Sequence, residues 1–346
     1  MNLLPHRHPA GAWRARLRRL LELAQRYPGL IAAFGFVSGV ASFLLVERHE
    51  GLAKVIALVM LASWVWLVLE NLLRESLSRW LGLRIPRVLL RYLTQLVHQE
   101  SLFFILPFFA ITTAWNSAQA VFTGLLGLAA LVSIIDPLYY RWLARRRWLY
   151  LAYHGITLFA VLLTALPIIL RLSTAQSYPL ALGIAVLLSF PSLSGLLQVQ
   201  RWWRGLALCG LALLLGTGGW LMRSWVPPAT LWMTEMAVST ELDNRNRAPG
   251  RSLDELRLAD LHRQGLFAYT AISAPRGLNE RIYHVWRRNG VEVDRIALDI
   301  RGGRKAGYRA WSHKLRFPED AVGRWQVQVV TEAGQMIGTL RFRVRE

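Results

Sequence analysis

Long apolar runs separated by short polar segments occupy the first two thirds of the chain. Seven of these runs approach the length of about 20 residues that a bilayer-crossing helix needs. They lie at Leu30–Val46, Leu52–Leu69, Leu102–Trp115, Ala118–Ile135, Leu149–Leu170, Pro179–Leu197 and Gly205–Met222. We therefore predict an α-helical polytopic membrane domain of about seven spans over residues 28–222.

The third and fourth runs come from one stretch, Ser101–Ile135, which contains no charged residue. This stretch is longer than one span requires, and it has a polar patch in its middle that suits a tight turn. The patch consists of Thr112, Thr113, Asn116 and Ser117. We predict a helical hairpin here. A single long tilted helix is the alternative, and it would reverse the sides on which the later loops lie.

Polarity alternates with a period of two in the last third of the chain. The pattern follows an extended Trp225–Pro228 segment, so we expect a linker at 223–230 and a separate domain at 231–346. Strict alternation is typical of half-buried antiparallel strands. The strand candidates are Leu231–Ser239, Leu266–Ser273, Arg281–Arg288, Val291–Ile300, Gly307–Ser312, Gly323–Thr331 and Met336–Arg345.

About seven strands in this length predict an all-β immunoglobulin-like sandwich. Asn289-Gly290 stands between two strand candidates and is the strongest hairpin signal in the chain. Ser252–Glu255 has the spacing of a capping box and predicts one short helix. We expect the large core side chains to be Trp286, Trp311 and Trp325.

Charge adds an orientation to this architecture. Lys and Arg number 41 against 21 Asp and Glu. Seventeen basic residues lie on the N-terminal segment and on alternate loops, and three lie on the other loops. Lys and Arg in short loops favour the cytoplasm. We therefore predict a multi-pass protein of the bacterial inner membrane, with a cytoplasmic N-terminus and a periplasmic C-terminal domain.

The positions of the Lys and Arg residues also indicate which class of partner the protein binds. The basic residues flank the predicted spans, where they would contact anionic lipids, and this argues against nucleic-acid binding. Residues 1–27 read as a cytoplasmic amphipathic segment and not as a cleaved signal peptide. Of all residues 54% are hydrophobic, which excludes a disordered chain, and one cysteine excludes a disulfide framework.

Several segments resemble known families. Between residues 265 and 344, the pieces HVW…NG, GYRAWSHK, GRWQV and GQ…LRF resemble domain-of-unknown-function family 2914. SFLLVERHEGLAKVIALVMLASWVWLVLENLL and ESLFFILPFF resemble the membrane family 5924, which accompanies that domain in Gram-negative bacteria. The resemblance implies an inner-membrane protein with a periplasmic domain, and it implies no activity.

Four ionisable residues lie near the cytoplasmic ends of the predicted spans: Glu70, Glu100, Asp136 and His154. They could pair with loop arginines, relay protons, or hold a divalent metal or a hydrolytic site. His98 is two residues from Glu100 and could join them. Glu100, Asp136 and His154 are our candidates for catalysis, although no known catalytic motif accompanies them.

A dense aromatic and basic run lies in the C-terminal domain. Alternation places Arg309, Trp311 and His313 on one face, and Lys314 follows them. Such side chains could stack on sugars or bind phosphate. The alternative is that Trp311 belongs to the core and that the charges are solvated.

Together these patterns predict a non-enzymatic membrane protein without a cofactor or a metal. Its C-terminal sandwich would bind an envelope protein or a glycan. The alternative is a membrane enzyme or an ion-coupled carrier that uses Glu100, Asp136 and His154.

Overall fold

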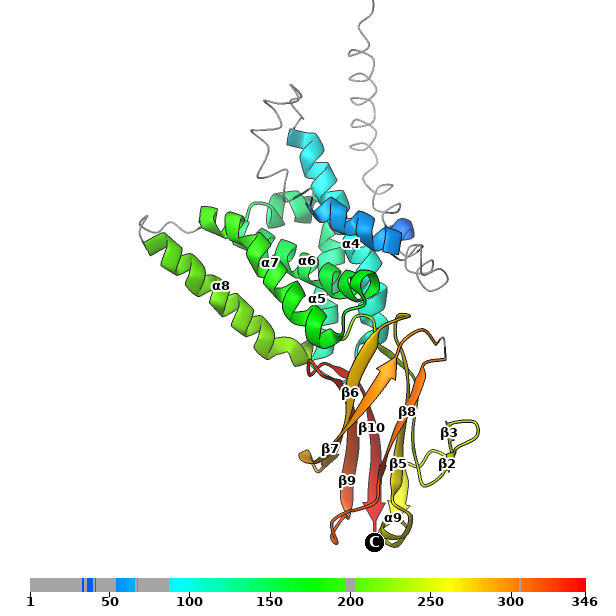
Figure 1. The fold of residues 1–346 in the computed structure, drawn as a ribbon. Coiled ribbons are helices and arrows are strands. Elements are labelled where there is room, and N and C mark those ends of the chain that lie inside the picture. Colours follow the sequence, from blue (N-terminus) through cyan, green and yellow to red (C-terminus); the bar gives the residue numbers. More distant parts are fainter. Residues whose placement is uncertain are drawn as a thin grey trace, which may run out of the picture.

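The structure, a computed structural model, describes residues 33, 36–39, 41, 54–65, 67, 87–196, 203–304 and 306–346. A helical region and a β region lie end to end, and the C-terminus is at the end of the β region far from the helices (Figure 1). The N-terminal segment 1–27, most of the predicted first span and Glu70 lie outside the described residues.

Helices joined by short turns make up the described part of the chain before residue 226. A short apolar helix, Lys54–Val65, precedes the main bundle. The elements that follow are α4 (Arg87–Thr112), α5 (Gln119–Ile134), the π-helix η1 (Pro137–Leu143), α6 (Arg147–Leu170), α7 (Thr174–Leu196), α8 (Trp203–Leu221) and the 3-10 helix η2 (Met222–Trp225).

The predicted helical hairpin is confirmed, because α4 ends at Thr112 and α5 begins at Gln119. Polar groups of the intervening turn satisfy one another. The Gln119 side chain accepts a hydrogen bond from the Ala114 N–H (3.0 Å), and the Ser117 N–H donates to the Ala114 carbonyl (2.9 Å). The polar patch therefore reverses the chain without leaving its backbone groups unpaired.

The number of spans differs from the prediction. Two described helices are long and apolar enough to cross a membrane, Arg147–Leu170 and Gly205–Trp225. The pair α5 and η1 makes a third only if it counts as one span bent by 102°. Counting apolar runs gave too many spans for two reasons. Some of the helices are short, and α4 contains buried polar residues such as Gln95, His98 and Gln99.

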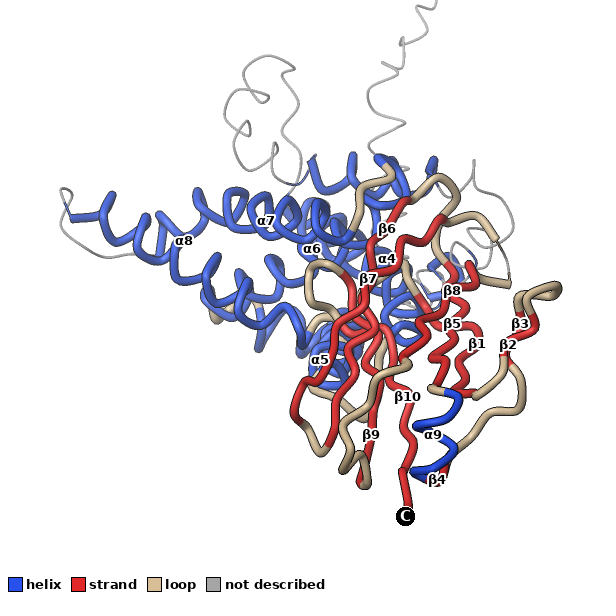
Figure 2. Tube along the Cα trace, turned by 60° about the horizontal axis from the view of Figure 1, so that its bottom comes forward, coloured by secondary structure: helices blue, strands red, loops and turns tan. Residues whose placement is uncertain are grey.

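The two long helices differ in what surrounds them. In α6, 72% of the apolar stretch is buried inside the protein, whereas only 6% is buried in α8. Leu213 and Leu214 of α8 are 73% and 68% exposed. Figure 2 shows α8 at the edge of the bundle. A predominantly apolar helix that the protein leaves uncovered suits lipid, not water.

The β region contains two main sheets. One has the order β1-β5-β8 and the other β4-β10-β9-β6-β7. The strands are β1 (Trp232–Ser239), β4 (Glu255–Arg257), β5 (Leu266–Ser273), β6 (Asn279–Arg288), β7 (Val291–Arg301), β8 (Tyr308–Lys314), β9 (Gly323–Thr331) and β10 (Met336–Arg345). A small arm, β2 (Leu242–Asp243) and β3 (Ala248–Pro249), and a helix, α9 (Leu258–Gln264), complete it.

Side chains from both sheets share one apolar core. Trp286 and Trp325 are 0% and 1% exposed there, as predicted. Trp311 is the exception, because it is only partly buried and packs on the opposite side of its sheet from this core. Strand alternation explains the difference, since Ala310 and Ser312 take the inward positions of β8.

Of the two short-range predictions for the β region, the hairpin is confirmed and the capping box is wrong. Asn289 and Gly290 have φ values of 47° and 88°, as a tight hairpin requires. The capping-box prediction is wrong at Ser252–Glu255. Residues Glu255–Arg257 form β4 and pair in parallel with Arg343–Arg345, and the helix begins only at Leu258. A free strand edge on β10 outweighed the local helix signal.

Candidate functional site

The helical and β regions meet at a seam, by which we mean the contacts between the turns of the bundle and the near end of the sheets. Glu280 of β6 is 3% exposed and lies under the first turn of α7. Its carboxylate accepts hydrogen bonds from the backbone N–H of Thr174 (2.8 Å) and from the Thr174 hydroxyl (2.5 Å). The first N–H groups of a helix lack partners within the helix, so Glu280 caps α7 from another region.

Burial gives Glu280 unusual proton affinity. It raises the pKa of this carboxyl to about 7, although the hydrogen bonds from Thr174 act in the opposite direction. The nearby Glu332 carboxylate raises the pKa further by repulsion. Glu280 therefore titrates near neutrality while it is held in the seam.

Two glutamines add further contacts to the seam. Gln335 is 2% exposed, and its side-chain N–H groups donate to the carbonyls of Val226 (3.0 Å) and Pro227 (3.1 Å). Gln119, which is fully buried, donates to the carbonyl of Met336 (2.9 Å). The expected linker at 223–230 is thus partly buried, since residues 226–230 all lie in the seam.

A second cluster lies inside the helical region. His98 of α4 is fully buried, with its Nδ1 2.9 Å from the Tyr139 hydroxyl and its Nε2 3.2 Å from Nδ1 of His154. Trp64 packs edge-on against His98 (5.4 Å between ring centroids) and donates to the Ser101 hydroxyl (2.9 Å). We call Tyr139, His98 and His154 the histidine chain.

Of the three ionisable candidates, only His154 joins this chain. Asp136 instead accepts a hydrogen bond from the Gln95 side chain (2.8 Å). Glu100 lies two residues from His98, which is about 200° around a helix, so the two point to different faces. Glu100, Asp136 and His154 do not form a metal-holding group, since no group of three metal-ligating side chains occurs among the described residues.

The β8 candidates occupy the outer face of the three-stranded sheet, except for Lys314. The Arg247 guanidinium lies 5.2 Å from the Trp311 ring, and Arg309 donates to the carbonyl of Asn246 (2.6 Å). The turn between β2 and β3 therefore contacts this face of the sheet. His313 stacks on Phe267, with ring centroids 3.8 Å apart.

Lys314 turns inward and is 7% exposed. Its ammonium lies 2.7 Å from an Asp294 carboxylate oxygen and 5.5 Å from the Phe317 ring. The hydrogen bond from Lys314 lowers the pKa of Asp294. Lys314 is thus engaged between the sheets and is not placed to bind a ligand together with Arg309 and Trp311.

His284 is a buried polar group that the sequence pattern did not predict. Its Nδ1 lies 2.9 Å from the Ser312 hydroxyl, and its Nε2 lies 3.2 Å from the Thr270 hydroxyl. Burial lowers the pKa of His284 to about 4. A neutral, fully enclosed imidazole that joins β5, β6 and β8 serves the core and offers no reactive surface.

Sequence signals for these groups differ in strength. His98 and Gln95 are three residues apart, and this helical spacing could have placed them on one face. Nothing local could have paired Glu280 with Thr174, because 106 residues separate them. Buried contacts of this kind depend on how the regions dock.

Two family models match the chain. Residues 10–268 match a family of unknown function, DUF5924, and residues 279–344 match a protein of unknown function, DUF2914. No curated protein and no solved structure matches it. The first match runs past the helices and into β5, so strands of one core come from both matched parts.

Proposed function

The chain belongs to the DUF5924 family, and we propose that it is a multi-pass inner-membrane protein that presents its β region to a binding partner in the periplasm. In this proposal the helical region is an anchor and the protein is not an enzyme. The β region, which we take to be an immunoglobulin-like sandwich, binds an envelope protein or a glycan. The multi-pass topology, to which the described helices contribute two or three spans, and the lipid contacts of the basic loops belong to the same proposal.

The buried seam is the observation that carries the proposal. A tethered domain on a free linker would need none of the enclosed hydrogen bonds of Glu280, Gln335 and Gln119. Ala333 of the β9–β10 turn also packs into the apolar cluster of the helices. Such contacts favour a β region held at a fixed position over the bundle.

The ends of the helices support the orientation. The α4–α5 turn and the start of α7 touch the β region, and these are the loops that carry few basic residues. Arg145, Arg146 and Arg147 lie at the other end of α6, about 36 Å away for a helix of this length. If the arginine-rich end faces the cytoplasm, the β region lies outside it.

Cysteine labelling tests this orientation. Cys209 is replaced by serine, and single cysteines are introduced as Asn116→Cys and Arg145→Cys, both at exposed positions. In spheroplasts we expect a membrane-impermeant maleimide to label Asn116→Cys and to spare Arg145→Cys, with the reverse result in inside-out vesicles. Labelling of both sites from the same side would contradict the proposal.

Proton-coupled transport is a second candidate function, and the histidine chain is the observation that favours it. His98 lies within hydrogen-bond distance of both Tyr139 and His154 inside the bundle, and all three groups can exchange protons. Proteoliposomes with a potassium diffusion potential and an internal pH dye test this function. We expect proton uptake to vanish in His98→Phe and His154→Phe and to persist in Glu100→Gln. Wild-type uptake no faster than that of empty liposomes would eliminate this candidate.

A further inference from the structure

A groove with a volume of about 1230 Å³ opens on the surface of the β region, and its lining extends to the C-terminal residue, Glu346. Strands β9 and β10 and the Asn289-Gly290 hairpin supply its lining. Four arginines line it against two acidic side chains, and we call it the arginine groove. The arginines are Arg324, Arg341, Arg343 and Arg345, and the acidic residues are Asp254 and Glu346.

Two of these arginines are direct neighbours across the sheet. Arg343 of β10 is the register partner of Arg324 of β9, and both side chains are exposed. Like charges at directly opposite positions destabilise a sheet. Neither side chain forms an ion pair within the part of the chain that the structure describes, whereas Arg345 pairs with Glu255. No ion pair within the described residues therefore offsets the repulsion between Arg324 and Arg343.

Strand alternation keeps these charges outside. Leu340, Phe342 and Val344 of β10 fill the core at exposures of 5% or less, so the arginines between them must face outward. Residues two apart along a strand are about 7 Å apart, which sets the spacing of the charges of β10. The result is a row of three arginines on β10, with Arg324 of β9 beside the middle one, Arg343.

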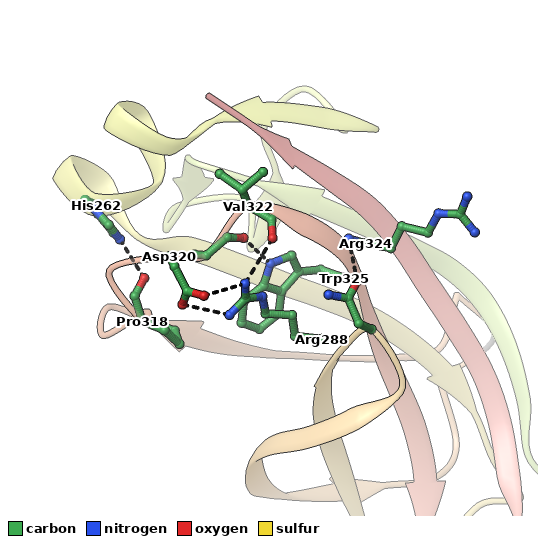
Figure 3. Close-up of polar contacts among 9 residues, drawn as sticks. His262, Arg288, Pro318, Asp320, Val322, Arg324 and Trp325 are labelled. Atoms are coloured by element: carbon green, nitrogen blue, oxygen red, sulfur yellow. Dashed lines mark hydrogen bonds and ion pairs between the residues drawn. The ribbon is translucent and has the colours of Figure 1, made fainter.

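Firm contacts shape the wall of the groove. Arg288 forms a two-pronged ion pair with Asp320 (2.9 and 3.0 Å) and donates to the Val322 carbonyl (3.2 Å), as Figure 3 shows. The Trp325 ring N–H donates to the Ala321 carbonyl (2.7 Å). In the same view the Arg324 side chain extends away from these contacts.

We propose that the arginine groove binds the phosphate groups of an anionic glycan, with Arg324 and Arg343 converging on one phosphate. This inference rests on the proposed function, since it assigns a place and a ligand class to the binding role of the β region. A planar guanidinium donates two parallel hydrogen bonds to a phosphate, and two of them meet where the strands pair.

Other ligand classes fit this groove less well. A protein partner would be expected to find an exposed aromatic or apolar centre, but Trp325, Phe342 and Val344 turn their side chains into the core. Arg343 lies three residues before the C-terminus, which is at the end of the β region far from the helices, so the bilayer that holds α8 does not reach the pair of Arg324 and Arg343. A chain-like polyanion in solution remains as the occupant.

The test measures binding of phosphorylated dextran to the full chain in phosphatidylcholine nanodiscs. We expect wild-type protein to bind phosphorylated dextran and to ignore unmodified dextran. The double variant Arg324→Gln/Arg343→Gln should lose at least about tenfold in affinity, because two charge-assisted contacts disappear. The control is Arg281→Gln/Arg295→Gln, which removes the same charge from arginines already paired with Asp299 and Glu292. It should change the affinity less than about threefold.

Thermal unfolding gives an independent readout. Arg343→Gln should raise the melting temperature of the unliganded protein by relieving repulsion, and phosphorylated dextran should raise that of the wild type. Equal losses in both double variants, or equal binding of carboxylated dextran at matched charge, would overturn the inference. So would tighter binding of a single-stranded oligonucleotide. None of these results alters the labelling pattern, which reports orientation and therefore tests the proposed function separately.

Discussion

At the scale of the residue, burial distinguishes tryptophans that look alike in the sequence. Trp325 is 1% exposed, donates a hydrogen bond to Ala321 and lies parallel to Phe342 at 6.1 Å. Trp311 sits on the outer face of its sheet beneath Arg247. The same residue type therefore stabilises the core in one place and shapes a surface in the other.

Trp325→Ala should destabilise the β region by about 3–5 kcal/mol, because removal of a buried aromatic leaves a cavity. Limited proteolysis and the melting temperature measure the loss. Trp311→Ala is the matched control, and we expect it to cost less than about 2 kcal/mol, since its ring is only partly enclosed. Wild-type resistance to protease in Trp325→Ala would contradict the assignment of Trp325 to the core.

At the scale of the element, tight connections decide how the strands meet the seam. Gly302 follows β7, and its N–H donates to the Leu278 carbonyl (2.8 Å). A Cβ atom at this position would lie 1.8 Å from the Pro275 carbonyl oxygen, a distance that no packing tolerates. Gly290 in the β6–β7 hairpin has a positive φ but open space around it.

Gly302→Ala should therefore displace the end of β7 and lower the melting temperature of the β region by more than Gly290→Ala does. For Gly290→Ala we expect a cost of about 1 kcal/mol, which comes from backbone strain alone. Differential scanning fluorimetry of the two variants side by side measures the difference. A larger loss in Gly290→Ala would show that the close approach at Gly302 is not rigid.

At the scale of the whole molecule, the seam joins two regions that belong to different structural classes. Its central group, Glu280, is held by Thr174 at the start of α7 and has a pKa of about 7 because it is buried. If the β region separates from the helices, water reaches this carboxyl and its pKa returns to the ordinary value of 4.5. Docking and protonation are therefore linked.

Because the docked state has the higher pKa, docking takes up a proton as the pH falls from about 7 to about 4.5. Docking should strengthen by up to about tenfold per pH unit in this window and be weaker at pH 8 than at pH 5. Hydrogen-exchange protection of the first-turn amides of α7, corrected for intrinsic rates, measures it. Glu280→Gln should abolish the dependence, and Glu332→Gln, at an exposed neighbour, should retain it.

Local patterns were enough to place most of the strands. The predicted ranges at Leu266–Ser273, Gly323–Thr331 and Met336–Arg345 coincide with β5, β9 and β10. The end of helix α4 at Thr112 could also be predicted from the sequence. These features follow from neighbours in sequence, because side-chain alternation and turn residues act within a few positions.

The candidate site was only partly visible. His154 and the neighbouring His98 were both visible as candidates and lie within hydrogen-bond distance of each other, whereas the contact of Asp136 with Gln95 was not predicted. Alternation correctly put Arg309 and Trp311 on one face, yet nothing in the sequence showed that the β2–β3 turn would contact them. Partners that are distant along the chain depend on packing, which local periodicity does not encode.

The sequence by itself determined the division into a helical and a β region, the hairpins and the outward alternation of the arginines, since each depends on short-range geometry. Only the tertiary structure decided which helices are uncovered, that Glu280 caps α7, and that Arg324 stands opposite Arg343. The physical reason is that strand register and docking are selected by the free energy of burying surfaces contributed by remote parts of the chain.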